Sequence, residues 1–424
     1  MIWRMPTEEP CARIVAVGSL ADEVLPLIRT RADLTYYAAT AHGEQMHTAV
    51  DLLEQAFGSE DPKTVYAVMN KAIASAITLI LRADDSNGII GDAIARLLEL
   101  HPKAASAAHT PAGALVEWMI TFQFNGKVDY FSLDPVAYAP ALGTTGMTTY
   151  RVRLAAIEAN LAPEPAEGDR WSSPYSHERH VLEWNAQRLA VLDRDVEAII
   201  RTHARDRRVA AWHEDTARAL AEIGEIELAI GWAQQATDFD GGHQSAKAAG
   251  YWCTLLAEHR PDQLLAARLT TFERWPNAST AAYLHRDAGA EWPPLHERVL
   301  HRLATSPRDA VLFSLLTLKD PELGWHLAHT LDLQDEDTWN QVAKAYEKVN
   351  PLAVLPVLAD LVERELVQAD AFHYRNAARR LKKMRRLAAG TEHAPEVDEQ
   401  IARLRETYRR RPRLQQEFDR AGLP

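Results

Sequence analysis

Residues 64–81 read TVYAVMNKAIASAITLIL, and this stretch sets the expected fold class. Its apolar side chains recur at three- and four-residue steps, which places them on one face of an amphipathic helix. Turn-forming residues follow directly, because residues 84–88 read DDSNG. The sequence therefore predicts a helix over residues 64–81 that ends before this turn.

The same helical spacing extends along most of the chain. Further helices are predicted from Ile89, from Pro111 and from residues 134–135, with a glycine break over residues 143–146. Beyond residue 176, turn signals with Gly or Pro recur at gaps of roughly 12 to 20 residues, which suit single helices of ordinary length. We therefore predict an all-α protein.

One alternative to the helical pattern stays open at residues 122–131. The pair Asn125-Gly126 suits a tight β-turn, and the residues on both sides of it alternate in the manner of short strands. A β-hairpin over residues 122–131 is therefore kept as an alternative.

The chain is expected to divide at residues 162–176 (APEPAEGDRWSSPYS), where three prolines and the lack of a hydrophobic period are typical of a linker. We predict an N-terminal helical domain over 1–161, this linker over 162–176, an irregular α-solenoid over 177–371, and basic C-terminal helices over 372–424 that cap the solenoid.

The solenoid prediction rests on residues 224–236 (GEIELAIGWAQQA), which resemble the turn and second helix of a tetratricopeptide repeat (TPR). In this comparison Gly224 takes the turn, and Ala229, Ala233 and Ala236 let paired helices approach. A looser copy follows over residues 260–276, and later helices continue in a degenerate, HEAT-like manner. Such helix pairs stack into superhelices.

Composition narrows the classes of protein that fit. The 424 residues are 47% hydrophobic and 25% charged, as in an ordinary globular protein, and the net charge is −12. Two cysteines, Cys11 and Cys253, cannot form a disulfide framework or a four-thiolate zinc site. No apolar run reaches the ~18 to 20 residues of a membrane span, and no basic region precedes the short apolar stretch from Ile14. We expect a cytoplasmic protein.

Residues with catalytic or metal-binding spacing do not stand out. His296 and His301 belong to HExxxH rather than HExxH, and two side chains five apart on a helix lie about 140° apart around its axis. Glycine-rich phosphate loops and nucleophile elbows are missing. The sequence therefore predicts no catalytic residues, no cofactor and no metal, and gives no support to an enzyme.

The turn after the first helix is the densest acidic cluster between two helices. Its spacing fails the calcium-loop pattern, since position twelve from Asp84 is an alanine. We interpret Asp85 or Ser86 as a helix N-cap, with a partner- or ligand-contacting turn formed by Arg82, Asp84, Asp85 and Ser86 as the alternative. An enzyme site around Asp84, Asp85 and His101 is a further alternative, which rests on polar clustering alone.

The C-terminal region has the largest local excess of positive charge in the chain. From Phe372 onward there are fourteen Lys and Arg against seven acids, so this segment is +7 while the rest of the chain is −19. A helix with the apolar stripe Tyr374, Ala377, Leu381, Met384 and Ala388 should dock on the fold and turn its cations outward. The candidate basic surface comprises Arg375, Arg379, Arg380, Lys382, Lys383, Arg385, Arg386, Arg409, Arg410 and Arg411.

Two interpretations of this basic surface remain open. It could bind nucleic-acid phosphates or an acidic partner. It could instead be a solvated helix that complements the acidic body of the protein. We favour the second, because no aromatic residues alternate with the cations as a single-strand binding platform requires.

One family resemblance involves several of these segments. Residues 82–92 (RADDSNGIIGD) followed by 97–101 (LLELH) resemble a signature of bacterial helical-repeat proteins related to SWIM zinc-finger proteins. Residues 224–236 and the helix over 374–387 are similar too, so the resemblance covers most of residues 60–424. It implies a helical scaffold. SWIM proteins carry C-x-C…C-x-H, which two isolated cysteines cannot supply, so the resemblance implies neither the zinc module nor a nucleic-acid role tied to it.

These observations favour a non-catalytic cytoplasmic α-solenoid scaffold whose partner is another protein. A nucleic-acid-associated protein that uses the basic C-terminal helices is the alternative, and an enzyme with a site near Asp84 and Asp85 is the second alternative. We expect no membrane partner.

Overall fold

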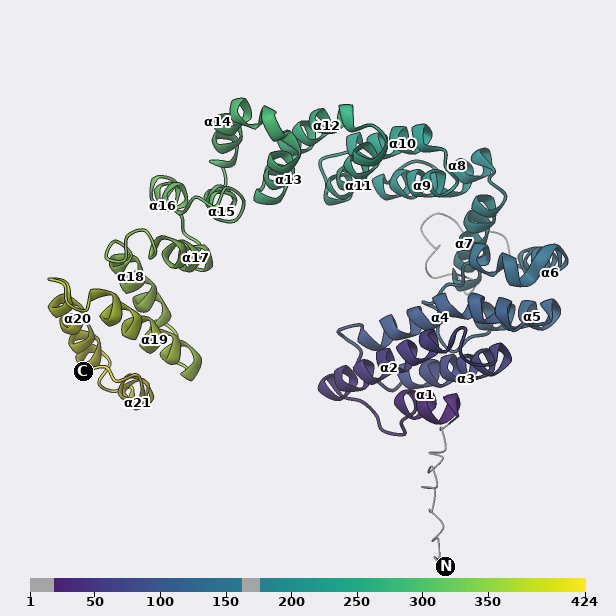
Figure 1. Ribbon diagram of the computed structural model, residues 1–424, viewed down its shortest axis with the longest axis horizontal. Helices are drawn as coiled ribbons and strands as arrows, with labels where there is room; N and C mark the ends of the chain where they lie inside the picture. The colour runs from purple at the N-terminus through teal and green to yellow at the C-terminus, as the bar shows by residue number, and fades with distance from the viewer. Residues whose placement is uncertain (1–18, 162–175) are drawn as a thin grey trace, which may run out of the picture. The chain divides into compact units, whose positions relative to one another are not determined.

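The computed structural model describes residues 19–161 and 176–424, and within these ranges every regular element is a helix (Figure 1). The all-α prediction is confirmed. A single isolated parallel bridge, between Leu34 and Ala83, is the nearest approach to sheet structure in the described residues. The predicted linker over 162–176 falls, except for its last residue, outside the part of the chain that the structure describes.

The chain forms two compact units, and each is described separately. Of the described residues, the first comprises 19–161, 176–208 and 218–225, and the second comprises 209–217 and 226–424. Helix α9 (Ala210–Glu222) therefore contributes residues to both units.

Eight helices of the first unit precede α9 in the described ranges. They are α1 (Leu20–Ile28), α2 (Tyr36–Ala56), α3 (Pro62–Ile80), α4 (Ile89–Ala107), α5 (Ala112–Phe124), α6 (Pro135–Ala159), α7 (Ser176–Leu192) and α8 (Val196–Ala204). The buried apolar side chains between α1 and α6 form one continuous core that extends from Leu20 to Leu154.

Helix α3 shows how local sequence sets the elements of this unit. The Asp61 carboxylate accepts a hydrogen bond from the Thr64 N–H at 2.9 Å, and Pro62 takes the first helical position, where a missing N–H costs nothing. The predicted apolar face is buried from Val65 to Ile77. The predicted helix over 64–81 is thus confirmed with ends at Pro62 and Ile80.

The alternative β-hairpin over residues 122–131 is wrong. Residues 122–124 are the last residues of α5, and residues 125–134 form bends and irregular backbone without a strand. The reason is packing: Trp118 and Phe122, four apart on α5, stack with ring centroids 5.3 Å apart, which favours the helix over an isolated two-stranded hairpin.

Helix α7 belongs to the first unit, although we expected residue 177 to open the second domain. The Trp184 indole N–H donates to the Leu133 carbonyl at 2.8 Å, and Arg188 bonds both oxygens of Asp134. Buried Asn185 accepts from the Tyr150 hydroxyl at 2.7 Å. Because these contacts span more than thirty residues of sequence, helix periodicity could not reveal them.

The second unit contains the remaining helices. They are α10 (Ile226–Asp238), α11 (His243–His259), α12 (Pro261–Arg274), α13 (Ala278–Ala288), α14 (Trp292–Leu303), α15 (Pro307–Leu312), α16 (Pro321–Thr330), α17 (Glu336–Tyr346), α18 (Leu355–Glu365), α19 (Ala371–Ala388), α20 (Ala394–Thr407) and α21 (Pro412–Ala421). A short 3₁₀-helix, η2 (Gly289–Glu291), precedes α14, and a π-helical stretch, η3 (Phe313–Thr317), follows α15.

Packing in the second unit follows the order of the chain (Figure 1). Each helix from α10 onward packs mainly on helices one or two places away in the sequence. The core is accordingly divided into successive clusters: one around Phe272 and Phe313, one around Val311 and Val342, and one that extends from Ala343 to Leu423. The last cluster joins α17 and α18 to the C-terminal helices.

The repeat-like segment contains a glycine turn and a buried face of small residues. Gly224 has a positive φ of 86° in the turn before α10. Ala229, Ala233 and Ala236 are fully buried, and α10 packs on α11. Small side chains thus allow two helices to approach closely at this point.

Candidate functional site

The Arg82–Ser86 turn connects α3 to α4 and serves the structure of the first unit. Asp85 accepts hydrogen bonds from the Ile90 N–H at 2.9 Å and the Gly91 N–H at 2.8 Å. These are first-turn amides of α4 that no carbonyl of the helix can satisfy. Asp85 therefore bonds the first amides of α4, but the predicted N-cap position is wrong, because Gly88, whose φ is 77°, occupies it.

The other predicted residues of the turn are also engaged within the fold. Arg82 donates to the carbonyls of Arg31 and Thr30, each at 3.0 Å. The Ser86 hydroxyl donates to Asp84, so Ser86 does not cap α4 as we had considered. The turn consequently joins the connection between α1 and α2 to the start of α4.

Large apolar side chains are exposed around this turn. Leu81, which precedes it, is 55% exposed, and Tyr37 on the first turn of α2 is 84% exposed. That turn of α2 is tied to the site, since Asn87 donates to the Thr40 hydroxyl at 2.8 Å. Tyr130 is 60% exposed; its pKa is raised by partial burial and by the negative charge of Asp85. Exposed tyrosines beside a rigid turn are typical anchors for a protein partner.

His101 lies apart from the acidic turn. It is the thirteenth residue of α4, so it stands about 18 Å along the helix from Ile89. Its ring is fully buried, stacks on Trp118 with centroids 4.1 Å apart, and bonds the Tyr138 hydroxyl at 2.9 Å. The possible enzyme site around Asp84, Asp85 and His101 is not formed, because α4 holds the histidine in the core.

Burial controls the protonation of His101. Removal from water disfavours the imidazolium and lowers its pKa to about 3. Its Nε2 lies 3.3 Å from the Asn70 Oδ1, which only accepts, so Nε2 carries the proton and Nδ1 accepts from the Tyr138 hydroxyl. The neutral ring is thus a satisfied member of the core.

The basic C-terminal surface is centred on α19. The predicted apolar stripe is confirmed, since Tyr374, Ala377, Leu381, Met384 and Ala388 are all buried. The helix packs on α18, α20 and α21 with this face. Its cations therefore lie at the edges of the helix interface or on the face turned away from it.

The cations at the edges of α19 are bound to carboxylates on other helices. Arg380 pairs with Glu365, which is 8% exposed, and also donates to Asn340 at 3.0 Å. Lys383 pairs with Glu347, and Arg385 pairs with Asp398 at 2.7 Å. These contacts join α19 to α17, α18 and α20 and serve the fold.

The cations of the α20–α21 connection divide in the same way. Arg411 stacks on Tyr408, 4.4 Å from the ring centroid, and donates to the Leu366 carbonyl at 2.7 Å. Arg409 pairs with Glu406 at 2.7 Å on the surface, and neighbouring Arg410 is exposed. Only part of the predicted basic surface is therefore available to a ligand.

Comparison with known proteins gives one family. Residues 21–414 match the family described as "Family of unknown function (DUF6880)". The chain belongs to the DUF6880 family. No curated protein matches this DUF6880 chain.

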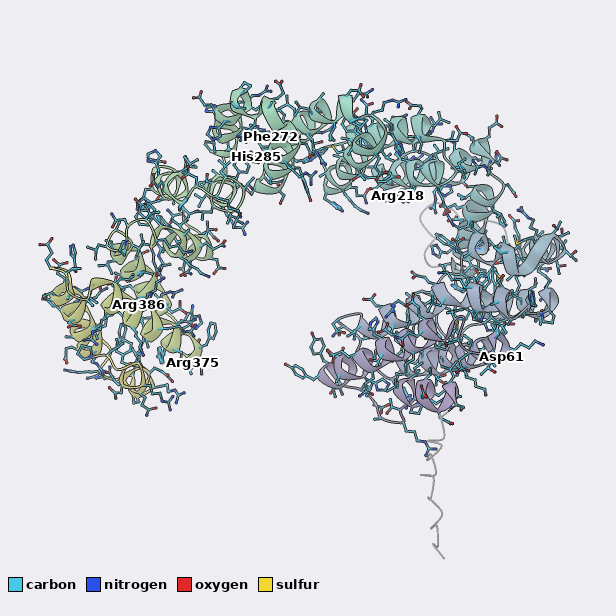
Figure 2. All side chains as sticks on the ribbon, in the orientation of Figure 1. Asp61, Arg218, Phe272, His285, Arg375 and Arg386 are labelled. Carbon is cyan, nitrogen blue, oxygen red and sulfur yellow. The ribbon has the colours of Figure 1, made fainter. Side chains whose placement is uncertain are left out.

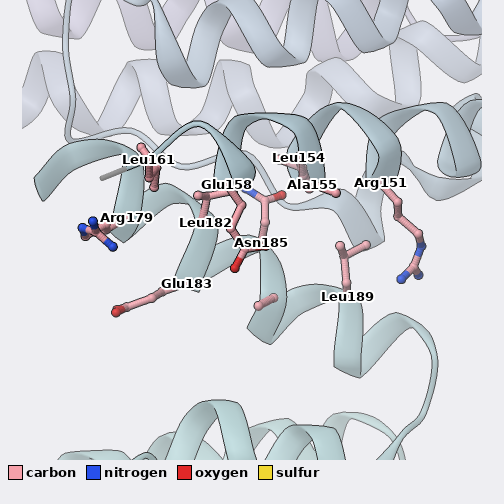
Figure 3. Close-up of a pocket in the computed structure, with 11 residues that line it drawn as sticks. Arg151, Leu154, Ala155, Glu158, Leu161, Arg179, Leu182, Glu183, Asn185 and Leu189 are labelled. Carbon is pink, nitrogen blue, oxygen red and sulfur yellow. The ribbon is translucent and has the colours of Figure 1, made fainter. Parts of the chain in front are cut away.

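A cavity of about 500 Å³ lies between α6 and α7 in the first unit of the DUF6880 chain (Figure 3). Its walls combine leucines with charged side chains; Arg151 at one end pairs with Asp193 at 2.7 Å. Sequence reasoning missed this cavity, because it depends on the tertiary contact of two helices separated by the expected linker. None of its described residues forms a nucleophile–base pair.

Among the described residues, no helix is both long and apolar enough to cross a membrane. Within the same residues, His, Cys, Asp and Glu side chains do not gather into a group of three that could hold a metal ion.

Proposed function

We propose that this DUF6880 chain is a cytoplasmic α-solenoid scaffold that binds another protein. The observation that carries the proposal is the packing order of the second unit, in which helices contact their neighbours in sequence and form successive core clusters. Proteins built in this quasi-one-dimensional way present extended surfaces that suit partner binding. The resemblance to the helical regions of SWIM-related proteins agrees with this function.

The Arg82–Ser86 turn supports a docking point on the first unit. Its polar side chains hold the turn rigid through bonds to the α1–α2 connection and to α4. Tyr37, Leu81 and Tyr130 are exposed around it, and a tyrosine side chain loses little conformational entropy when a partner buries it. A partner that buries these side chains would gain apolar burial energy without ordering the surface first.

The test is affinity capture from a native extract, with every protein quantified by mass spectrometry. We compare the full chain, the double variant Tyr37→Ser/Tyr130→Ser, and the matched control Val152→Ser/Val367→Ser, whose valines are exposed elsewhere. We expect one partner in fixed proportion with the wild type and the control. The amount of this partner captured by the tyrosine variant should fall at least about tenfold, which corresponds to the loss of about 1.4 kcal/mol of binding free energy. Recovery of all three proteins alone would refute the proposal.

A further inference from the structure

Helix α19 bears seven cations and no acidic residue. Four of them, Arg375, Arg379, Lys382 and Arg386, are spaced by four, three and four residues. At 100° per residue they fall within about 60° of one another around the helix axis, and they extend about 16 Å along it. This row of four, called the α19 row below, lies opposite the buried stripe. Figure 2 marks Arg375 and Arg386 near the two ends of α19.

The α19 row is largely unneutralised. Among the described residues, three carboxylates, Glu347, Glu365 and Asp398, make all the ion pairs of the Lys and Arg side chains of α19, and they leave four of those seven positive charges uncompensated. A further ion pair joins His373 to Asp370 at the N-terminus of the helix. Arg375, Arg379 and Lys382 are exposed and form no ion pair within those residues. Arg386 is 69% exposed and shares Glu347 with Lys383.

We infer that the α19 row binds the phosphate backbone of a nucleic acid, independently of sequence. The row meets about five phosphate steps of one strand, since a duplex strand carries one charge per about 3.4 Å. Guanidinium groups suit phosphates because their paired N–H groups can bond two oxygens at once. This inference rests on α19 alone and does not depend on the scaffold proposal.

The surroundings of the row favour phosphates over an acidic protein helix. An exposed carboxylate–cation pair contributes only about 0 to 1 kcal/mol, so a protein partner needs apolar anchors beside the charges. The row itself offers none; an exposed apolar side chain, that of Phe372, lies on the first turn of α19, three residues before Arg375. A nucleic acid needs no such anchor, because release of its condensed counterions drives binding.

Carboxylates flank the row on both sides: Asp398 pairs with Arg385 on the α20 side, and acidic residues line a groove on the other side. A groove of about 400 Å³ between α17, α18 and α19 is lined by Glu336 and Asp337 together with Arg380. These acids would repel a backbone that moved toward the groove. The phosphates are therefore expected to follow the axis of α19 and leave the groove empty.

The test measures binding of the full chain to a short fluorescein-labelled DNA duplex by fluorescence anisotropy. Four phosphate contacts predict a slope of about −3.6 for log K against log salt, which is an affinity loss of about 150-fold between 50 and 200 mM salt. Arg379→Gln/Lys382→Gln should reduce this loss to about 12-fold. The matched control Arg403→Gln/Arg409→Gln changes the net charge equally but alters exposed, paired arginines, and it should keep the wild-type slope.

Arg380 and Lys383 are left unchanged in this test. Sequence alone suggests that charge reversal across residues 379–383 is the natural experiment, but these two cations hold Glu365 and Glu347 and their loss would disturb the fold.

Three results would overturn the inference. The first is no binding of the duplex at 50 mM salt, and the second is equal loss of binding in the control and the row variant. The third is displacement of the duplex by poly-L-glutamate or by phosphatidylserine vesicles at equal charge concentration, which would assign the row to an acidic protein or a membrane surface. Partner capture in the scaffold experiment is unaffected by any of them.

Discussion

Burial of His101 makes the stability of the first unit depend on pH, and His101→Gln tests this dependence. In the folded chain the pKa of His101 is lowered from 6.5 to about 3 by burial. Between these values the unfolded chain binds a proton that the folded chain does not. The contribution of His101 to the free energy of unfolding is therefore fully present above the unfolded pKa and is lost as the pH falls. From about pH 7.5 to about pH 5.0 the group removes about 2 kcal/mol from the free energy of unfolding.

The assay is native-state hydrogen exchange of the full chain, read on peptides from α4, which contains His101. Wild type and His101→Gln are compared at the same pH, so the intrinsic exchange rate cancels. The variant loses the ring stacking on Trp118 and is less stable at about pH 7.5. Because glutamine does not titrate, this deficit should shrink by about 2 kcal/mol at about pH 5.0.

His393 provides a control of opposite sign. A hydrogen bond to Glu396 raises the pKa of this exposed histidine, so its contribution is present below the unfolded pKa and is lost as pH rises through the folded one. The deficit of His393→Gln, read on α20, should therefore grow as pH falls. A His101→Gln deficit that is the same at both pH values would refute the burial argument, since it would mean that the folded chain protonates His101 as readily as the unfolded one.

Three further substitutions test local structure in the first unit. Asp85→Ala leaves two first-turn amides of α4 without an acceptor and should lower the free energy of unfolding, measured by thermal unfolding, by about 1 to 2 kcal/mol. Asp92→Ala removes only a charge near the start of the helix and should lower it by about 0.3 to 1 kcal/mol. Gly143→Ala should lower the free energy of unfolding by about 1 to 3 kcal/mol, because a backbone with φ of 59° and ψ of −177° is open almost only to glycine. Gly113→Ala, at a helical position with open space around it, should be neutral or stabilising. Equal effects of the two substitutions would contradict the assignment of strain to Gly143. Arg188→Gln breaks ion pairs with two carboxylates and should cost about 1.5 to 3 kcal/mol in urea unfolding; an unchanged midpoint would show that α7 is held by other contacts.

Helix positions were accessible from sequence because they depend on residues close together in the chain. The apolar spacing of α3, the Asp-Pro start of α6 and the stripe of α19 each predicted an element that the structure contains. The cap of α4 was partly predicted: Asp85 does bond the first amides, but from three residues before the N-cap. The position of the capping side chain relative to the first residue of the helix depends on the exact backbone path between α3 and α4.

The candidate sites were harder to predict, because their chemistry depends on distant partners. Arg380 and Arg379 are adjacent and identical in type, yet only Arg380 meets a buried carboxylate, and that carboxylate belongs to α18. His101 has the polar character of a site residue, but Tyr138 and Trp118 come from other helices to enclose it. Sequence spacing contains no information on either contact.

An all-α chain with an acidic body and a basic C-terminal end follows from the amino-acid sequence, because helix formation and charge content are properties of neighbouring residues. Tertiary structure alone decided which of those charges are available. Packing brought Glu347, Glu365 and Asp398 to the edges of α19 and left Arg375, Arg379, Lys382 and most of Arg386 in water. A cation can act on a ligand only where the fold has not already neutralised it.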